Sequence, residues 1–390
     1  MHRFVELRRI AETICKDGEV NMEFEDVIQS LCWLALERVA KSPAPRNTTG
    51  AEKNASLLSA AAYLGCFSIA KRLLLEGTSP TRVDNLFPCA VQAAALAGNV
   101  EMLQFLQEAL QEAGANNDDD HGYRWHPSLG YVSLGGKGES EAMVGAAMRG
   151  DIKMLHLALH PATSYAASTK PDDRPSTPSG PSSSQQPARR VSGGGGSGSG
   201  SGSANPAHAV LAAMQHARTL DVYTHLASFF PDFLKQYPEQ AGRHLELYAE
   251  YGNTPIVRHL LEAGVPVGGS RAPFHPTPLH HAARRSYADI VHLLLDRGAD
   301  VRKYCRQLGD PLFAAVDGGD LAVVRALLDR GAVCNYSTLQ QAVFSERTDL
   351  VDLMMRNCTL LEWHMPKILD SARKAGLHSM VEYVEGRIRT

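Results

Sequence analysis

Histidine, cysteine and carboxylate side chains are the residues through which this sequence could bind a metal or activate a nucleophile. Among its 390 residues there are 16 histidines and 7 cysteines. No two cysteines have the C-x-x-C or C-x₄-C spacing of a zinc or redox site. The histidines His208, His216 and His225 have no partner at i+4 and no carboxylate at ligand spacing. We therefore predict that the protein holds neither a metal nor a cofactor.

A glycine-rich run at residues 193–202 has the composition of a loop that cradles phosphate groups. Such a loop needs a strand before it and a helix with Lys-Ser/Thr after it, and the surrounding sequence offers neither. The sequence also lacks a G-x-S-x-G nucleophile elbow and an H-E-x-x-H zinc motif. No residue is a candidate for catalysis and no small-molecule substrate is evident, so we predict that the protein is not an enzyme.

The same run belongs to a longer segment of low complexity, residues 168–203. Of its 36 residues, 24 are Ser, Gly or Pro. A segment of this composition buries too little apolar surface to offset the entropy lost on folding. We therefore predict a disordered insertion at residues 161–206.

Two short motifs within the insertion suit protein kinases. The sequence RRVS at residues 189–192 resembles the substrate motif of basophilic kinases, and a proline follows Thr177 as proline-directed kinases require. A disordered chain fits the groove of a kinase active site. Ser192 and Thr177 are thus candidate phosphorylation sites.

The overall charge argues against nucleic acid as a partner. Lys and Arg number 39 and Asp and Glu number 42, which gives a net charge of −3, whereas nucleic-acid binders carry an excess of basic residues. The N-terminus lacks the apolar run of a secretory signal, and no stretch approaches the ~18 apolar residues of a membrane span. We expect an intracellular protein, cytoplasmic or nuclear, with reduced cysteines and no membrane partner.

An internal repeat organises most of the chain, and its clearest unit runs from Thr277 to Val301. Thr277 is a helix N-cap, and Pro278 suits the first turn of a helix. Apolar stripes mark two short helices, the first through Leu279, Ala282 and Ala283 and the second through Ile290, Val291, Leu294 and Leu295. Gly298 then ends the second helix.

The first apolar residue of each unit reveals the period. These anchor residues are Leu58, Val91, Met143, Leu211, Leu245, Leu279, Leu312, Leu339 and Leu369. From Leu211 onward the steps are 34, 34, 33, 27 and 30 residues. The step from Met143 to Leu211 is 68, and its excess of 35 almost equals the 36-residue Ser/Gly/Pro segment. This match favours one stack with a looped-out insertion, while two arrays on a tether remain the alternative.

Two further regions depart from the repeat. The step from Val91 to Met143 has an excess of 19 residues that matches the segment from Ala115 to Gly138, which we predict as a long loop. Residues 1–50 fit the template poorly. They contain two apolar helical faces, which predict a helix pair that caps the array.

The unit at Thr277 resembles an ankyrin repeat, because its opening TPLH-x-AA pattern is nearly complete. The resemblance implies an all-α ankyrin-repeat solenoid of stacked helix-turn-helix units with a long disordered insertion. The expected organisation is an N-terminal helical cap region at 1–50, three repeats at 51–160, the insertion at 161–206, and repeats with a C-terminal cap at 207–390. Ser286 and Glu346 replace the usual mid-repeat glycine, so irregular packing is expected there.

Ankyrin-like proteins typically bind other proteins through the concave face of their first helices and through turn tips, so the resemblance implies an adaptor or scaffold. Carried onto this sequence, the partner-binding residues are Tyr251, His281, Arg284, Arg285, Arg302, Lys303, Tyr304 and Arg306. The five cations among them suggest one basic patch for an acidic or phosphorylated protein. In this family a histidine at the position of His280 is structural. The alternative function is an enzyme or enzyme subunit with a reaction site in the same groove.

Overall fold

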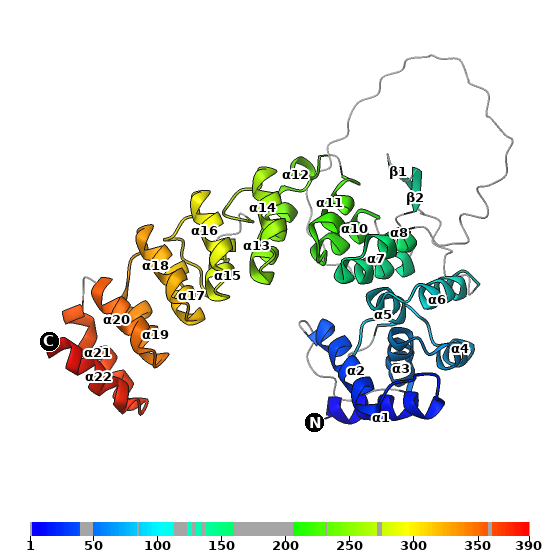
Figure 1. The fold of residues 1–390 in the computed structure, drawn as a ribbon. Coiled ribbons are helices and arrows are strands. Elements are labelled where there is room, and N and C mark those ends of the chain that lie inside the picture. The colour runs from blue at the N-terminus through cyan, green and yellow to red at the C-terminus, as the bar shows by residue number, and fades with distance from the viewer. Residues whose placement is uncertain are drawn as a thin grey trace, which may run out of the picture. The chain divides into compact units, whose positions relative to one another are not determined.

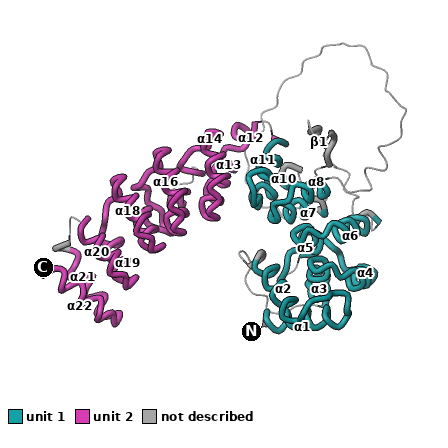
Figure 2. Tube along the Cα trace, in the orientation of Figure 1, with its two compact units in different colours: residues 1–229 teal, residues 230–390 magenta. Residues whose placement is uncertain are grey.

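The computed structural model of the chain is built mainly of helices (Figure 1). It describes residues 2–39, 50–83, 86–112, 123–126, 130–133, 137–159, 206–230, 232–270, 275–357 and 361–389. The chain divides into two compact units, unit 1 at residues 1–229 and unit 2 at residues 230–390 (Figure 2). The helical fold class predicted from the sequence is confirmed. Of the predicted insertion, residues 161–205 lie outside the described part of the chain.

Unit 1 is a series of helix pairs, and its first helices are rich in small residues. One of them reads AVQAAALA, with five of its residues buried, and small side chains let neighbouring helices approach closely. The pairs are α1 (His2–Asp17) with α2 (Phe24–Val39), α3 (Gly50–Leu64) with α4 (Phe67–Leu75), α5 (Ala90–Ala97) with α6 (Val100–Glu112), α7 (Lys137–Arg149) with α8 (Ile152–Leu159), and α10 (Pro206–Gln215) with α11 (Leu220–Ala227).

The first helices of unit 1 form a continuous layer. In this layer α3 packs on α5, α5 on α7 and α7 on α10, and α8 also contacts α11. The backbone N–H of Arg218, just before α11, donates to the Ala147 carbonyl of α7 at 3.0 Å. Within unit 1, the stack continues past the insertion.

A short β-hairpin lies between α6 and α7, where the sequence analysis predicts only a loop. β1 (Tyr123–His126) pairs antiparallel with β2 (Gly130–Ser133), with Tyr123 opposite Ser133. The prediction of a loop is thus wrong for these residues. Tyr123, Trp125, Tyr131 and Val132 are types that favour strands, and the Asn/Asp run before them obscured that signal.

Unit 2 repeats the same pairing. Its helices are α12 (Phe233–Gln236), followed by α13 (Pro238–Tyr251) with α14 (Thr254–Glu262), α15 (Pro278–Arg284) with α16 (Ala288–Asp296), α17 (Pro311–Gly318) with α18 (Leu321–Asp329), α19 (Tyr336–Phe344) with α20 (Thr348–Asn357), and α21 (Leu361–Lys374) with α22 (His378–Arg389). Each first helix packs on the next first helix, and each second helix on the next second helix (Figure 1). The unit is therefore a two-layered solenoid.

The anchor residues of the sequence repeat form the core of this stack. All nine are buried. Leu245, Leu279 and Leu312 lie on α13, α15 and α17, which pack one on the next, and none is more than 1% exposed. Each such leucine stabilises the fold by about 2 kcal/mol through removal of its side chain from water. Side chains one period apart in the sequence are thus neighbours in one hydrophobic layer.

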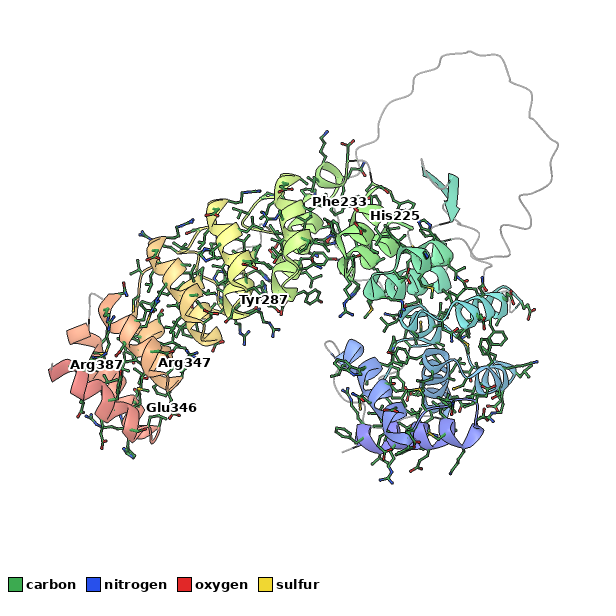
Figure 3. All side chains as sticks on the ribbon, in the orientation of Figure 1. His225, Phe233, Tyr287, Glu346, Arg347 and Arg387 are labelled. Atoms are coloured by element: carbon green, nitrogen blue, oxygen red, sulfur yellow. The ribbon has the colours of Figure 1, made fainter. Side chains whose placement is uncertain are left out.

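Two turns within the helix pairs keep the regular geometry without glycine. The glycines Gly252 and Gly319 join the helices of their pairs with φ of 76° and 82°. Ser286 and Glu346 occupy the same place between α15 and α16 and between α19 and α20, with φ of 60° and 56° (Figure 3). Both residues thus adopt the left-handed conformation of the glycines, which costs a residue with a Cβ roughly 1–2 kcal/mol.

Most of the described cysteines are free thiols, namely Cys15, Cys32, Cys66, Cys89 and Cys305. Burial raises the pKa of the Cys66 and Cys89 thiols to about 12, so both act as apolar core residues. Cys334 is disulfide-bonded, and the prediction of reduced cysteines is wrong for this residue. Cys358 lies outside the described residues.

Candidate partner-binding surface

The first helices of unit 2 carry charged and aromatic side chains toward their C-terminal ends. On α13 these are Glu250 and Tyr251, on α15 they are His281 and Arg284, and Arg285 follows directly. Tyr251 is 54% exposed, and its ring meets the buried Tyr248 edge-on at 6.4 Å. Because the first helices pack side by side, residues one period apart lie next to each other here.

Glu250 links α13 to the end of α15. Its carboxylate accepts a hydrogen bond from Arg285 Nη2 at 3.3 Å, and His281 Nδ1 lies 3.7 Å from the other oxygen. Burial lowers the pKa of His281, and Arg285 and Arg284 lower it further against the opposing effect of Glu250. His281 is therefore neutral near pH 7, and the charge of Glu250 is balanced mainly by Arg285.

Asp317 of α17 makes the equivalent links in the next two repeats. Arg284 Nε donates to one of its carboxylate oxygens at 3.2 Å, and Gln341 Nε2 of α19 donates to the other at 2.9 Å. The two ion pairs, Arg284 with Asp317 and Arg285 with Glu250, are partly exposed. Each therefore stabilises the fold by less than about 1 kcal/mol. Their main effect is to fix the orientation of the arginines and to balance their charge.

A rigid loop between α16 and α17 presents the other predicted contact residues. Directly after Tyr304, Cys305 and Gly309 close residues 305–309 of this loop, because their N–H groups donate to each other's carbonyl oxygens at 2.7 and 3.1 Å. The Cys305 side chain is buried, and its sulfur accepts from the Leu308 N–H at 3.2 Å. The closed loop leaves Tyr304 60% exposed.

The basic residues of this loop face two different surroundings. Arg302 Nε donates to the Gly331 carbonyl of the following loop at 3.3 Å, which joins the two loops. Lys303 lines a hollow of about 380 Å³ between this loop and residues 266–270 of the preceding one. Arg306, two residues after Tyr304 in the sequence, is also exposed. The loop therefore combines an exposed aromatic ring with three exposed cations.

The structure divides the five predicted cations into two groups instead of one basic patch. α15 has 7 residues, so its two ends lie about 10 Å apart. Arg284 and Arg285 lie at its C-terminal end, whereas the loop of residues 301–309 is bonded to its N-terminal half through His280 Nε2 and Gly309 O at 3.2 Å. The sequence analysis pooled these residues because position in the sequence does not show where along the helix axis each one lies.

Gln341 was missed by the sequence analysis, although a signal for it existed. It follows its anchor Leu339 by two residues, as His281 follows Leu279. The same spacing rule therefore selects it for the surface formed by the first helices. The resemblance to ankyrin repeats also implies turn-tip contacts at Arg271 and Phe274, and both lie outside the described part of the chain.

Metal binding and membrane insertion find no support in the described part of the chain. Its His, Cys, Asp and Glu side chains form no group of three or more that could hold a metal ion. Among the same residues, none of the helices combines the length and the apolar character needed to cross a bilayer.

The stacked pairs of helices define the class of this protein as an α-helical repeat solenoid. A comparison with protein families then gives the kind of repeat: residues 245–338, which carry the surface described above, match the family model for ankyrin repeats in three copies. Residues 245–338 are thus ankyrin repeats, as the sequence suggested. A search of curated proteins finds no match to the chain.

Proposed function

We propose that this protein is a non-catalytic adaptor or scaffold that captures a partner protein on the described surface of unit 2. Ankyrin repeats are generally modules for protein–protein interaction. The observation that carries the proposal is the exposed Tyr304, which directly precedes the turn closed by Cys305 and Gly309. A tyrosine on a rigid loop loses little conformational entropy on binding, and tyrosine is common among interface hot spots.

Within this surface, we assign contact to the loop and support to the helix ends. Arg284 and Arg285 are already matched by Asp317 and Glu250, so a partner must compete with these carboxylates to reach them. Lys303 lines the hollow between two loops, and the exposed Tyr304 follows it directly in the chain. The proposed partner therefore has an acidic or phosphorylated segment that contacts Lys303 and Arg306 beside the Tyr304 ring.

The test compares capture by the full chain and by variants in the cells from which it comes. Tyr304→Ala combined with Lys303→Ala should lose the captured partner while circular dichroism and unfolding remain unchanged, because both side chains are exposed. Arg325→Ala, on the outer helix α18, is the matched control and should retain it. Equal capture by all three chains would refute the proposed site.

Regulation through the insertion is a second part of this proposal. Ser192 and Thr177 lie outside the described residues. They remain candidate phosphorylation sites because of the kinase motifs around them. Mass spectrometry of protein from its native cells should find phosphate at Ser192, and repeated absence there would refute this part.

We also infer that the adaptor acts in the cytoplasm or nucleus. The five free thiols support this inference, whereas the disulfide bond of Cys334 argues against it. The alternative of an enzyme with a site in the groove gains no supporting cluster from the described residues.

A further inference from the structure

The C-terminal helices of unit 2 enclose a hollow that plays no part in the surface described above. Its volume is about 540 Å³, which is within the range of pockets that hold small molecules. It lies between α20, α21 and α22 (Figure 1). The hollow is therefore formed by helices alone and not by the loops between repeats.

The walls of the hollow are aliphatic. They include Met355 of α20, Met365 and Leu369 of α21, and Ile388 of α22. Met365 and Leu369 are buried, whereas Ile388 is 53% exposed. Methionine side chains are flexible and adapt to the shape of what they contact. The end of a repeat array ordinarily presents a polar face to water, so an exposed isoleucine beside an apolar hollow is a surface that a ligand would cover.

Pro366 adds an apolar ring to the same walls, at a place where helices seldom contain proline. α21 begins at Leu361, so Pro366 is its sixth residue and lies beyond the first turn. A proline there removes a helical hydrogen bond and costs about 3 kcal/mol. The helix accepts this cost at a residue that lines the hollow.

The polar part of the lining consists of two arginines and one carboxylate. The carboxylate, Asp352, is already engaged: it accepts hydrogen bonds from Arg387 Nε and from Tyr383 Oη, each at 2.9 Å, and a further one from Arg387 Nη2. The hydrogen bonds from Arg387 are the main reason that the pKa of Asp352 lies below its usual range. Arg387 is thus a fixed part of the wall (Figure 3).

Arg356 is the cation that a ligand can engage. It is exposed, and its charge contributes to the lowered pKa of Asp352. Among the described residues, however, its guanidinium makes neither a hydrogen bond nor an ion pair. Because two arginines face one aspartate, the lining carries a net charge of +1. An anionic group of a ligand would be the first direct partner of Arg356.

The backbone around the hollow favours a ligand without peptide groups. Each lining residue lies beyond the first four residues of its helix, where backbone N–H groups are already bonded to the preceding turn. The guanidinium groups are therefore the N–H donors that these residues offer. A bound peptide would leave buried carbonyl groups without donors, which is costly, whereas a hydrocarbon chain needs none.

We propose that this hollow binds an aliphatic carboxylic acid in its ionised form. The hydrocarbon chain packs against Met355, Leu369 and Ile388, and the carboxylate accepts hydrogen bonds from Arg356. Charge complementarity selects the anion, and the aliphatic walls select the chain. The site goes beyond the function proposed above, because the two share none of their residues.

The first experiment measures binding of radiolabelled decanoate to the purified full chain by equilibrium dialysis. Binding should saturate at one site, and decanol, which has the same chain but no charge, should bind at least about tenfold more weakly. Arg356→Gln should weaken decanoate binding by about tenfold, because one charge-assisted hydrogen bond is lost. The matched control Arg325→Gln changes an exposed arginine of α18 and should bind as the parent chain does.

The apolar wall has its own pair of variants. Ile388→Ser should weaken decanoate binding by about fivefold through lost apolar contact, while Val333→Ser, at a similarly exposed residue outside the hollow, should leave it unchanged. Both residues are more than half exposed, so circular dichroism and unfolding should be those of the parent chain.

A second readout locates the ligand through isotope-labelled methionine methyl groups. The chain has 11 methionines, and Met355→Leu and Met365→Leu assign the two signals from the hollow. Decanoate should shift both signals and leave that of Met22, in unit 1, in place.

Three results would overturn the proposal: equal decanoate binding by Arg356→Gln and the parent chain, equal affinity for decanol, or unshifted Met355 and Met365 signals. A peptide selected on the full chain from a random library that displaces decanoate and binds more tightly would assign the hollow to a protein partner, and would also overturn it. Capture of a partner through Tyr304 is measured separately, so failure of either proposal leaves the other to its own test.

Discussion

At the scale of single residues, His280 links two repeats through both of its ring nitrogens. Nδ1 accepts a hydrogen bond from the Thr277 N–H at 3.1 Å, so the ring proton of the neutral form is on Nε2, which faces the Gly309 carbonyl at 3.2 Å. The side chain is fully buried. Its buried position lowers the pKa of His280 to about 4, and a second buried histidine, His244, has its pKa lowered to about 4 for the same reason.

These two histidines predict a loss of stability in mild acid. In the unfolded chain each imidazole takes up a proton as the pH falls below about 6.5, whereas the folded protein resists protonation until about pH 4. The free energy of unfolding should therefore fall between pH 6.5 and 4, by up to about 3 kcal/mol for each histidine. Urea unfolding at several pH values measures this slope.

His244→Phe is the variant that assigns the effect. It keeps an aromatic ring in contact with Phe233, whose ring stacks on His244 at 5.6 Å, and it removes one titrating group. The pH slope should become shallower, while the exposed His292→Gln control should keep the parent slope. An unchanged slope in His244→Phe would show that His244 does not carry the effect.

Glu346 supports a second prediction at this scale. Its φ of 56° lies in the left-handed region, which costs a residue with a Cβ roughly 1 kcal/mol. Glu346→Gly should therefore raise the free energy of unfolding by about 0.5–1 kcal/mol, measured by urea unfolding. Ser286→Gly should gain less, because it also loses the hydrogen bond from Ser286 Oγ to the Gly318 carbonyl. Destabilisation by Glu346→Gly would contradict the assigned strain.

At the scale of elements, the first helices of adjacent repeats pack closely because glycine occupies the positions where their backbones come into contact. A Cβ at Gly318 of α17 would lie 2.5 Å from the Arg284 carbonyl oxygen of α15. The clash is with backbone, so relief requires the two helices to move apart. The need for glycine at position 318 therefore comes from the close approach of α15 and not from the conformation of α17 itself.

Gly318→Ala should destabilise unit 2 by about 1–3 kcal/mol, since overpacking between helices outweighs the better helix propensity of alanine. Chemical unfolding followed by circular dichroism measures the change. The matched control is Gly386→Ala in α22, where a Cβ would meet nothing within 4 Å. That variant should be neutral or stabilising by up to about 1 kcal/mol. Equal effects of the two variants would argue against the helix contact.

At the scale of the whole molecule, the chain consists of two units with separate cores, and a long connection interrupts only the first. Because α7 and α10 pack directly, the helices of unit 1 do not depend on the residues between α8 and α10 for their contacts. We therefore expect the fold of unit 1 to tolerate changes in the length of this connection.

Deletion of residues 168–203 tests this independence. It shortens the connection from 46 residues to 10, and each doubling of a loop costs only about 0.6 kcal/mol. The deletion should therefore raise the stability of unit 1 by no more than about 1.5 kcal/mol. Urea unfolding of the full chain measures it, with a scrambled insertion of equal composition as control. Loss of the helical signal of unit 1 on deletion would contradict the direct packing of α7 on α10.

The sequence by itself determined the repeat, its helices and its core. Anchors such as Leu279 and caps such as Thr277 act within a few residues of their position, so spacing along the chain is enough to reveal them. Tertiary structure alone decided how the surface is arranged. Arg284 and Arg285 look like free cations in the sequence, and only stacking brings Asp317 and Glu250 of the adjacent repeats against them.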